Sequence, residues 1–375
     1  MKKKRVIVLY GGKSGEHEVP LQSAASVIRN LDRGKFEVVP VGIDKDGRWR
    51  YHDLSLIENT KGKELPVFRN QPEVTLVNRN EAALVPVGSG SPALDPQVDV
   101  VFPVMHGPLC EDGTIQGMME IADVAYVGSG VLGSALGMDK DMAKRLVQLA
   151  GCPIAPYVAL KKADWEAGRD AVIARGRGAF QLPVFVKPSN MGSSVGVHKV
   201  KDWKDLPNAL HDAFQYDEKI LVEKGIDARE IEVAVLEADH PGERPLTGVP
   251  GEVKPSGSHD FYSYESKYLD ENGAELILPA KLTEEQALEC RALAVKIFDA
   301  LELSGMARVD FLMDKRTGTF YFNEVNTIPG FTSISMYPKM MEAAGIPYGE
   351  LLTRLIDIAL RRHERRKMLR RDFTK

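Results

Sequence analysis

The sequence predicts a mixed fold, in which an α/β domain built on a doubly wound parallel sheet is followed by α+β segments where strands dominate. Two observations predict it. Strand-like and helix-like segments alternate over the first 138 residues, which is the pattern of a parallel sheet with helical crossovers. From residue 228 to the helical tail, apolar residues instead recur at every second position, as in strands that bury one face.

The elements of the first domain follow one another with clear boundaries. Glycines end the first strand, and Pro20 falls in the first turn of the next helix, where proline is tolerated. Parallel sheets bind ligands at the carboxyl ends of their strands, and Glu16 and His106 fall at two such ends. The expected elements are strands at 5–10, 36–44 and 98–105 and helices at 20–31 and 114–122.

The chain divides into three predicted domains, 1–138, 139–227 and 228–375. A charged helix begins near Met138, after a stretch of small residues, and this marks the first boundary. Residues 154–226 predict short strands with one long helical insert. The segment 253–272 is polar, rich in glycine and tyrosine, and has no regular period. A loop of that length inside a compact domain is usually a lid or a binding loop.

Composition excludes several classes of protein. The chain has 375 residues, 43% hydrophobic and 27% charged, with a formal charge of -4, which argues against nucleic acid or an anionic membrane as main partner. The three cysteines form no CxxC pair, so neither a zinc site nor a disulfide framework is predicted. The apolar run after the basic start spans about five residues, shorter than a signal-peptide core, and no run suits a membrane span. We expect a cytoplasmic protein.

A hairpin near the end of the chain gathers polar side chains on one face. The strands 306–314 and 319–326 are joined by the turn-like KRTG. Because residues two apart share a face of a strand, Arg308 points the same way as Asp310, and Glu324 the same way as Asn326. Such oxygen ligands suit Mg²⁺, which often also binds substrate phosphates. The alternative is a structural Arg–Asp pair beside an exposed glutamate.

Two further segments carry candidate nucleotide-binding groups. Lys187 ends a strand that leads into the small-residue loop SNMGSSVG, whose backbone N–H groups can approach phosphates closely. This loop runs from strand to strand, so it is no Walker A motif, and GKS at 12–14 lacks the required upstream glycine because Ile7 stands there. In KILVEKGIDAREIEVAVL, Glu223 can accept from an adenine amine and Glu230 from ribose hydroxyls. The alternatives are a plain hairpin turn and a surface charge cluster.

Glu16 lies between a glycine turn and a helix. A carboxylate there can stabilise the start of the helix, or it can hold the ammonium group of an amino-acid substrate.

Taken together and in this order, these segments resemble the D-alanine–D-alanine ligase family of the ATP-grasp superfamily, over nearly the whole chain. The strings that carry the resemblance are GGKSGEHEV, HGPLCEDGTIQG, GMDK, VKPSNMGSSVGV, VEKGIDAREIEVAVL, FYSYESKY, ARVDF and NEVNTIPGFTSIS. The resemblance implies a three-domain ATP-grasp ligase with an N-terminal pre-ATP-grasp domain and the nucleotide held between two antiparallel sheets. It implies ATP-dependent, ADP-forming ligation of two D-alanines through D-alanyl phosphate, for peptidoglycan and the cell wall, by a homodimer.

The resemblance also implies nucleotide and metal roles. Two Mg²⁺ ions, or Mn²⁺ in their place, are expected on Asp310, Glu324 and Asn326, with Glu324 bridging them. The nucleotide is expected to have its phosphates on Lys140, Lys187 and the lid residue Lys267, its adenine on Glu223 and the backbone of Lys224, Gly225 and Ile226, and its ribose on Glu230.

The resemblance places the amino-acid substrates as well. It assigns the first D-alanine to Glu16 and His106, the second to Ser335 and Met336, and the tetrahedral intermediate to Arg308 and the Gly330 N–H. Tyr268 in the lid is expected to hydrogen-bond Ser193 and Glu16, and its place after Lys267 favours D-alanine over D-lactate as second substrate. Pro20 and Cys110 depart from the family, where serine and glycine are usual.

Two other functions compete with this one. Another ATP-grasp ligase would share the nucleotide site but lack SGEHE and FYSYESKY, and this chain has both. A non-catalytic nucleotide-binding regulator would have lost a metal ligand or Arg308, and all of them are present.

Overall fold

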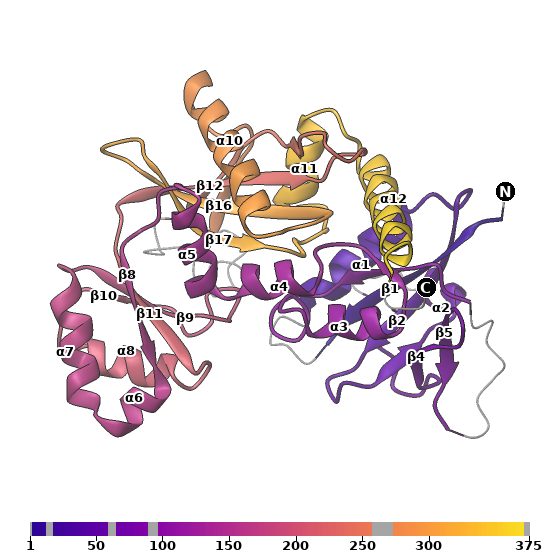
Figure 1. Ribbon diagram of the computed structural model, residues 1–375, viewed down its shortest axis with the longest axis horizontal. Coiled ribbons are helices and arrows are strands. Elements are labelled where there is room, and N and C mark those ends of the chain that lie inside the picture. Colours follow the sequence, from indigo (N-terminus) through magenta and orange to yellow (C-terminus); the bar gives the residue numbers. More distant parts are fainter. Residues whose placement is uncertain (1, 13–17, 59–64, 89–96, 257–272, 371–375) are drawn as a thin grey trace.

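A computed structural model describes residues 2–12, 18–58, 65–88, 97–256 and 273–370. Within them the chain forms three larger sheets in succession (Figure 1). Helices α4 (Val131–Met138) and α5 (Lys140–Leu149) connect the first sheet to the second. The stretch of small residues before the predicted boundary is therefore helical itself, which the sequence analysis did not anticipate.

The first sheet has the order β3-β2-β1-β6-β7. Its central strand β1 (Lys4–Gly11) runs parallel to β2 (Phe36–Ile43) and to β6 (Val100–Val104). β7 (Ala125–Tyr126) is parallel to β6, and the edge strand β3 (Trp49–Tyr51) is antiparallel to β2. Residues Arg5–Gly11 of β1 are all buried, as expected of a parallel strand covered on both faces. The predicted parallel sheet is confirmed.

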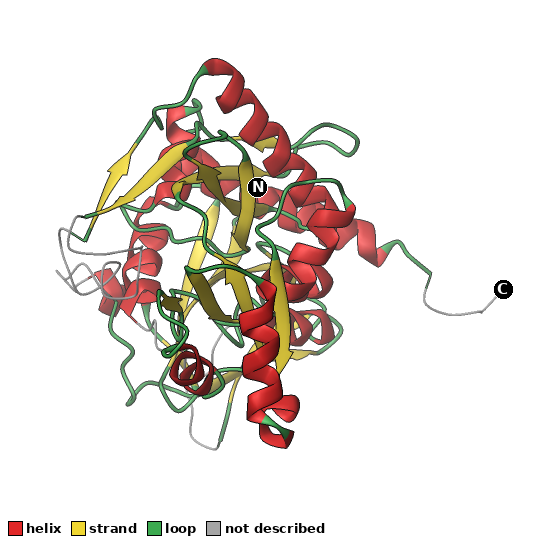
Figure 2. Ribbon diagram, turned by 90° about the vertical axis from the view of Figure 1, so that its left-hand side faces the viewer, coloured by secondary structure: helices red, strands yellow, loops and turns green. Residues whose placement is uncertain are grey.

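Helices cover this sheet on both sides. Val6 and Val8 share a core with α1 (Glu18–Asn30) and with α12 (Tyr348–Lys367), the last helix of the chain. Ile7 and Leu9 face the opposite core, with α3 (Thr114–Ile121) and the hairpin of β4 (Val74–Asn78) and β5 (Ala82–Pro86). A short helix α2 (Leu54–Glu58) also belongs to this region. The last helix therefore packs against the first sheet, where Figure 1 places α12 beside α1 and β1, and Figure 2 shows helices around the central strands in the side view.

The second sheet is antiparallel, with the order β10-β9-β11-β8. Its strands are β8 (Tyr157–Lys161), β9 (Val184–Pro188), β10 (His198–Val200) and β11 (Lys219–Lys224). Helices α6 (Lys162–Ala167), α7 (Arg169–Ala179) and α8 (Leu206–Ala213) pack on one face around Trp165 and Phe214. The expected single helical insert is wrong, because β9 and β10 separate α7 from α8.

The third sheet is also antiparallel, with the order β15-β14-β12-β16-β17, and β13 (Leu246–Thr247) pairs with β12. Its strands are β12 (Ala228–Leu236), β14 (Gly251–Pro255), β15 (Ala274–Ile277), β16 (Met306–Asp314) and β17 (Phe320–Asn326). Helix α10 (Glu284–Ala300) interrupts the expected run of strands. A capping box of Thr283 and Gln286 starts it, and this pattern is readable in the sequence. Helix α11 (Met336–Ala343) follows the last strand.

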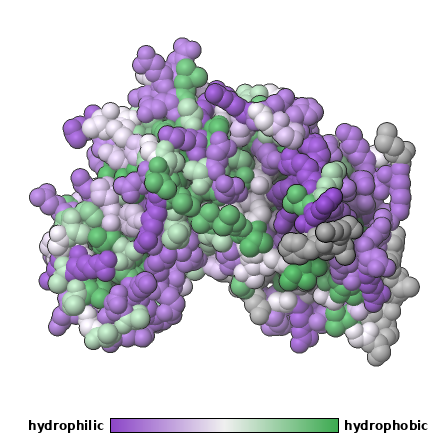
Figure 3. Space-filling model, in the orientation of Figure 1, coloured by the Kyte–Doolittle hydropathy of each residue, from purple (hydrophilic) through white to green (hydrophobic). Residues whose placement is uncertain are grey.

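The surface is hollowed between the lobe of the second sheet and that of the first (Figure 3). Hydrophobic residues gather in the middle of the same face, where Figure 1 places α4 and α5. Val131, Leu132 and Leu149 on these helices are exposed. Among the described helices, none combines the length and apolar character that crossing a membrane requires.

Candidate active site

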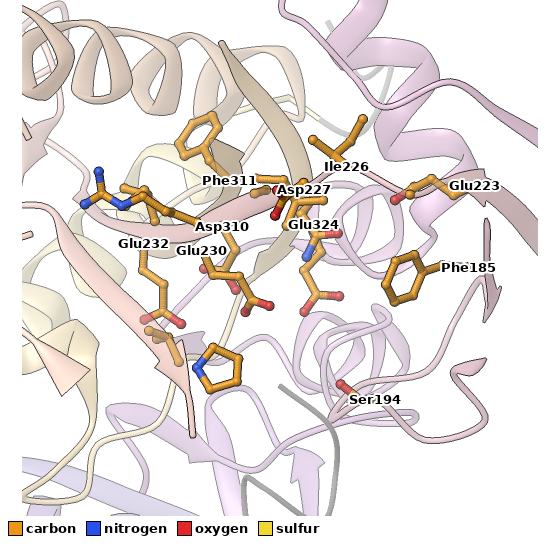
Figure 4. Close-up of a pocket in the computed structure, with 18 of the residues that line it drawn as sticks. Phe185, Ser194, Glu223, Ile226, Asp227, Glu230, Glu232, Asp310, Phe311 and Glu324 are labelled. Atoms are coloured by element: carbon orange, nitrogen blue, oxygen red, sulfur yellow. The ribbon is translucent and has the colours of Figure 1, made fainter. Parts of the chain in front are cut away.

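A cavity of about 1000 Å³ lies between the second and third sheets. Strands β9 and β11 form one wall, and β12, β14, β16 and β17 form the other. Figure 4 shows Glu230, Glu232 and Asp310 on one side of this space and Phe185 and Glu223 on the other. Its walls carry cations as well as carboxylates, so the cavity suits a large, charged ligand.

The carboxylates stand in a row across three neighbouring strands. In the register of the third sheet, Glu232 of β12 pairs with Asp310 of β16, and Asp310 pairs with Glu324 of β17. Asn326 pairs with Arg308 one step along the same face, and its amide donates to Asp310 Oδ2 at 2.9 Å. The predicted convergence of Asp310, Glu324 and Asn326 is therefore present in the backbone register.

Arg308 balances this negative charge. Its guanidinium donates to both oxygens of Asp310, at 2.8 and 2.7 Å, and its Nε lies 3.4 Å from Glu232 Oε1. Burial lowers the pKa of Arg308, but the charges of Asp310 and Glu232 outweigh burial and hold this pKa well above its ordinary value. Because a guanidinium is not deprotonated in proteins, Arg308 stays a cation.

A β-bulge turns one more polar side chain into the cavity. The register between β16 and β17 shifts after the pair Asp310–Glu324, so that Phe311 pairs with Phe322 and Asn323 is the extra residue. Both Asn323 and Glu324 line the cavity as a result, although neighbours in a regular strand point to opposite faces. Asn323 accepts from Lys187 Nζ at 3.1 Å, a contact that joins the two sheets.

Lys140 reaches the same space from the start of α5. Its Nζ lies 3.1 Å from Glu324 Oε2 and donates to the Met191 carbonyl at 2.6 Å. Asp139 caps α5 by accepting from the Met142 N–H, and also accepts from Ser189. These bonds fix the first turn of the helix and with it the position of Lys140.

The small-residue loop between β9 and β10 closes the cavity on one side. Ser193 and Ser194 adopt positive φ angles of 49° and 60°, which is uncommon for residues other than glycine and concentrates at functional sites. Gly196 also has a positive φ, and a Cβ there would lie 2.6 Å from a ring carbon of Tyr216. Ser194 lines the cavity, whereas Ser193 lies beside it in the loop.

Glu223 is buried between two lysines. Lys187 Nζ lies 2.8 Å from its Oε1 and Lys144 Nζ lies 2.8 Å from its Oε2. Burial raises the pKa of Glu223, but the charges of Lys144 and Lys187 outweigh burial and hold this pKa below its ordinary value. An ionised carboxylate only accepts hydrogen bonds, so Glu223 is set to receive an N–H donor.

The connector after Glu223 also borders the cavity, through Lys224, Gly225 and Ile226. The N–H of Lys224 donates to the Pro156 carbonyl at 2.9 Å, and that of Gly225 to the Pro183 carbonyl at 3.0 Å. These bonds fix the connector against the second sheet. Glu230 lines the third-sheet side of the cavity.

The loop after β17 is tied to the first domain by buried side chains. Glu111 accepts from the Gly107 N–H at 2.8 Å and from the Ile328 N–H at 3.1 Å. The Phe331 N–H donates to Ser23 Oγ at 3.1 Å. The loop that carries His106 and the loop that carries Gly330 are thereby held together.

The rest of this region forms a compact turn. Ser335 Oγ accepts from the Thr332 N–H at 3.0 Å, and a Cβ on Gly330 would lie 2.8 Å from the same oxygen. Met336 begins α11 and is buried. His106, Gly330, Ser335 and Met336 are not among the described residues that line the cavity.

Glu16, Lys267 and Tyr268 fall outside the described residues, as does the predicted lid from residue 257 onward. In the described part of the chain, no three His, Cys, Asp or Glu side chains are grouped to hold a metal ion by themselves. Asp310 and Glu324 with the Asn326 amide offer hard oxygens and no sulfur. Such a set fits Mg²⁺ that takes its remaining ligands from phosphates and water.

Four residues of this site escaped the sequence analysis. Glu232 stands two positions after Glu230 on the same strand, so alternation alone would have found it. Glu111 lies in the quoted string HGPLCEDG without having been singled out. The place of Asn323 in the site depends on the bulge, and the contact of Lys144 depends on its complete burial. Neither the bulge nor the burial leaves a local signal in the sequence.

Comparisons with known proteins match most of the chain to one family. A family model described as "D-ala D-ala ligase N-terminus" matches residues 5–129, and one described as "D-ala D-ala ligase C-terminus" matches residues 146–357. D-alanine--D-alanine ligase A of Bradyrhizobium diazoefficiens is 57% identical over 371 residues, which cover 98% of each chain.

Solved structures are similar over the same length. D-alanine-D-alanine ligase of Coxiella burnetii has a TM-score of 0.81 at 32% identity, covering 98% of this chain and 97% of its own. VanG D-Ala:D-Ser ligase of Enterococcus faecalis has a TM-score of 0.80 at 35% identity, covering 96% of this chain and 100% of its own. The predicted three-domain fold, with two antiparallel sheets after a parallel one, is confirmed.

Proposed function

The chain belongs to the D-alanine–D-alanine ligase family, and from this premise we propose how its residues join two D-alanines. It is an ATP-dependent, ADP-forming ligase that makes D-alanyl-D-alanine for peptidoglycan synthesis through a D-alanyl phosphate intermediate. One observation carries the residue assignment. Asp310, Glu324 and Arg308 converge with Lys140 and Lys187 on a single cavity between two antiparallel sheets.

ATP occupies this cavity. Lys140 and Lys187 bind its phosphates, and the ionised Glu223 accepts from the adenine amine. Because the N–H groups of Lys224 and Gly225 already donate to the second sheet, the Ile226 N–H is the donor to the ring edge. Glu230, on the opposite wall, accepts from the ribose hydroxyls.

Asp310, Glu324 and Asn326 hold two Mg²⁺ ions, which Mn²⁺ can replace. When bound, the ions neutralise charge on the phosphates. Lys140 and Arg308 now contact these carboxylates, so the protein carries its own countercharge beside the metal ligands.

The reaction has two steps. An oxygen of the first D-alanine's carboxylate attacks the γ-phosphorus of ATP, and the bond to ADP breaks. The free amine of the second D-alanine then attacks the acyl carbon, its nitrogen loses a proton to solvent, and phosphate leaves from the tetrahedral intermediate. Arg308, as a permanent cation, and the Gly330 N–H stabilise the oxyanion of that intermediate, for which each donor contributes about 3–4 kcal/mol.

The amino acids bind where the first domain meets the loop after β17. Glu16 holds the ammonium of the first D-alanine, with His106 beside it. Ser335 and Met336 seat the carboxylate of the second D-alanine at the N-terminus of α11, where the helix favours an anion. In the lid, Lys267 binds phosphate and Tyr268 hydrogen-bonds Ser193 and Glu16, which keeps water from the acyl phosphate.

The decisive test is phosphate release with ATP, Mg²⁺ and a panel of D- and L-amino acids, with the product identified by mass. We expect release with D-alanine, and D-alanyl-D-alanine as the product. D-serine is included as second substrate because one similar structure is a D-Ala:D-Ser ligase. D-lactate is included because the position of Tyr268 after Lys267 is expected to favour D-alanine over it. A mainly mixed dipeptide or ester under equal concentrations contradicts the proposal.

Two variants address the residue assignment. Arg308→Met is expected to lower kcat by about 10²–10³-fold, because it removes a preorganised cation from the transition state. Arg316→Met, in the exposed turn of the same hairpin, is the control and keeps its activity. Equal activity of the two variants contradicts the role of Arg308.

The resemblance also supports a cytoplasmic homodimer. The exposed apolar residues Val131, Leu132 and Leu149 offer a surface that association would bury. Light scattering at micromolar concentration is expected to give twice the mass of the chain, and a monomer under these conditions contradicts the proposal.

A further inference from the structure

Among the described residues, Lys144 is the one lysine that belongs to the largest fully buried side chains. It lies one helical turn after Lys140 on α5, but it does not line the described part of the cavity. Burying an ammonium group is costly unless it is paired. The groups that surround Lys144 must therefore compensate for its buried charge.

Lys144 connects three elements through its ammonium group. The Nζ lies 2.8 Å from Glu223 Oε2 on β11, with both side chains only 1% exposed, and donates to the Phe322 carbonyl on β17 at 3.2 Å. The rings of Tyr157 and Phe322 lie 6.0 and 5.8 Å from the same nitrogen. Carboxylate, carbonyl and aromatic faces are all favourable to a cation.

The two lysines that flank Glu223 are not equivalent. Lys187 lines the cavity and also contacts Asn323, so in the proposed function it turns to the nucleotide phosphates. Lys144 is fully buried and does not line the described part of the cavity, so it does not reach the nucleotide there. Once Lys187 serves the phosphates, Lys144 is the cation that stays in contact with the buried carboxylate among the residues that the structure describes.

The charge on Glu223 decides which purine it accepts. An ionised carboxylate accepts hydrogen bonds and cannot donate. The 6-amino group of adenine donates, whereas the 6-oxygen of guanine accepts. A neutral carboxyl group could donate a hydrogen bond to the 6-oxygen of guanine. A carboxylate would instead be repelled by that oxygen, because both groups are acceptors.

We propose that Lys144 is a positioning residue for nucleotide selection, which keeps Glu223 ionised and oriented toward the adenine amine while Lys187 binds the phosphates. This inference rests on the proposed role of Glu223 in the ATP site. It adds a residue that touches neither substrate nor metal, yet sets the preference for ATP over GTP.

The test measures binding of ATP and GTP with Mg²⁺ by calorimetry, without D-alanine, for the wild-type protein and Lys144→Met. We expect the ATP/GTP affinity ratio to fall about tenfold to hundredfold, the range of one hydrogen bond to a charged group. In ligation assays the KM for ATP rises while kcat at saturating ATP changes little. Lys161→Met is the matched control and keeps the ratio. Lys161 is an exposed lysine on β8, the strand that pairs with the β11 strand of Glu223.

A double-mutant cycle separates this role from simple damage to the fold. In a Glu223→Gln background no carboxylate remains to be kept charged, so adding Lys144→Met is expected to change the ratio less than about twofold. Lys144→Gln replaces Lys144→Met if the latter does not fold, which thermal unfolding reveals. The proposal is overturned if Lys144→Met keeps the wild-type ATP/GTP affinity ratio, or if the effects of Lys144→Met and Glu223→Gln on this ratio are fully additive. A wild-type protein that does not prefer ATP overturns the adenine role of Glu223 itself, and the Lys144 proposal with it.

Discussion

Glu111 is the carboxylate that joins the two loops of the amino-acid site. It is buried, and its two oxygens accept from the Gly107 N–H and from the Ile328 N–H, which lies 217 positions later in the chain. Glu111→Gln keeps the size of the side chain but replaces one oxygen with an NH₂ group. Whichever way the amide turns, one backbone N–H then faces another donor.

The expected loss of stability follows from these two contacts. A hydrogen bond to a charged group contributes about 1.5–3 kcal/mol, and a neutral one about 1 kcal/mol. Losing one charged bond and weakening the other lowers the free energy of unfolding by about 2–4 kcal/mol. The loops also shift relative to each other, and a displacement of about 1 Å can lower a rate by about 10²-fold. We expect a higher KM for D-alanine and a lower kcat.

Urea denaturation and steady-state kinetics with varied D-alanine measure both effects. The control is Asp112→Asn, since Asp112 accepts only from Leu109 and Thr114 within its own loop among the contacts seen. It is expected to lower stability without raising the KM for D-alanine. The reasoning is refuted if Glu111→Gln unfolds within about 0.5 kcal/mol of the wild type and keeps its KM.

Four further predictions follow from single contacts. Asp310→Asn removes a proposed metal ligand, so we expect Mn²⁺ to bind about tenfold or more weakly in the presence of ATP. Electron paramagnetic resonance measures this binding, and an unchanged affinity for Mn²⁺ contradicts the ligand set. Gly330→Ala places a Cβ 2.8 Å from Ser335 Oγ, so the KM for the second D-alanine rises in steady-state assays, and an unchanged KM places the substrate elsewhere. Arg362→Met leaves the Gly128 and Tyr126 carbonyls without their donor and lowers the unfolding free energy by about 2–4 kcal/mol, measured by urea denaturation. Burial lowers the pKa of His52 to about 4, so the folded state favours the neutral ring. The contribution of His52 to the free energy of unfolding is full above pH 6.5 and falls by about 3 kcal/mol between pH 6.5 and pH 4. His52→Gln should flatten this dependence of the unfolding free energy on pH, measured by urea denaturation.

Contacts close in sequence were predictable. The alternation in MARVDFLMD and TFYFNEVN correctly put Arg308 beside Asp310 and Glu324 beside Asn326, because a strand repeats every two residues. The parallel first sheet was equally predictable, since each strand there is a short apolar run followed by a helix. The family resemblance then supplied roles that no pattern contains.

Contacts distant in sequence were not predictable. Lys144 belongs to a charged helix, and its sequence surroundings would suit an exposed residue. Only the packing of α5 between β11 and β17 buries it against Glu223. Asn323 points into the cavity because of a register shift, and a register is a property of two strands together.

The sequence by itself therefore determined the alternating strands and helices of the first domain, the hairpin that carries the metal-ligand candidates, and the family. The tertiary structure decided which carboxylates stand in one row, which lysine is buried, and which loops Glu111 joins. The physical reason is that backbone periodicity and turn chemistry act between neighbours, whereas burial and charge pairing depend on segments that meet only after folding.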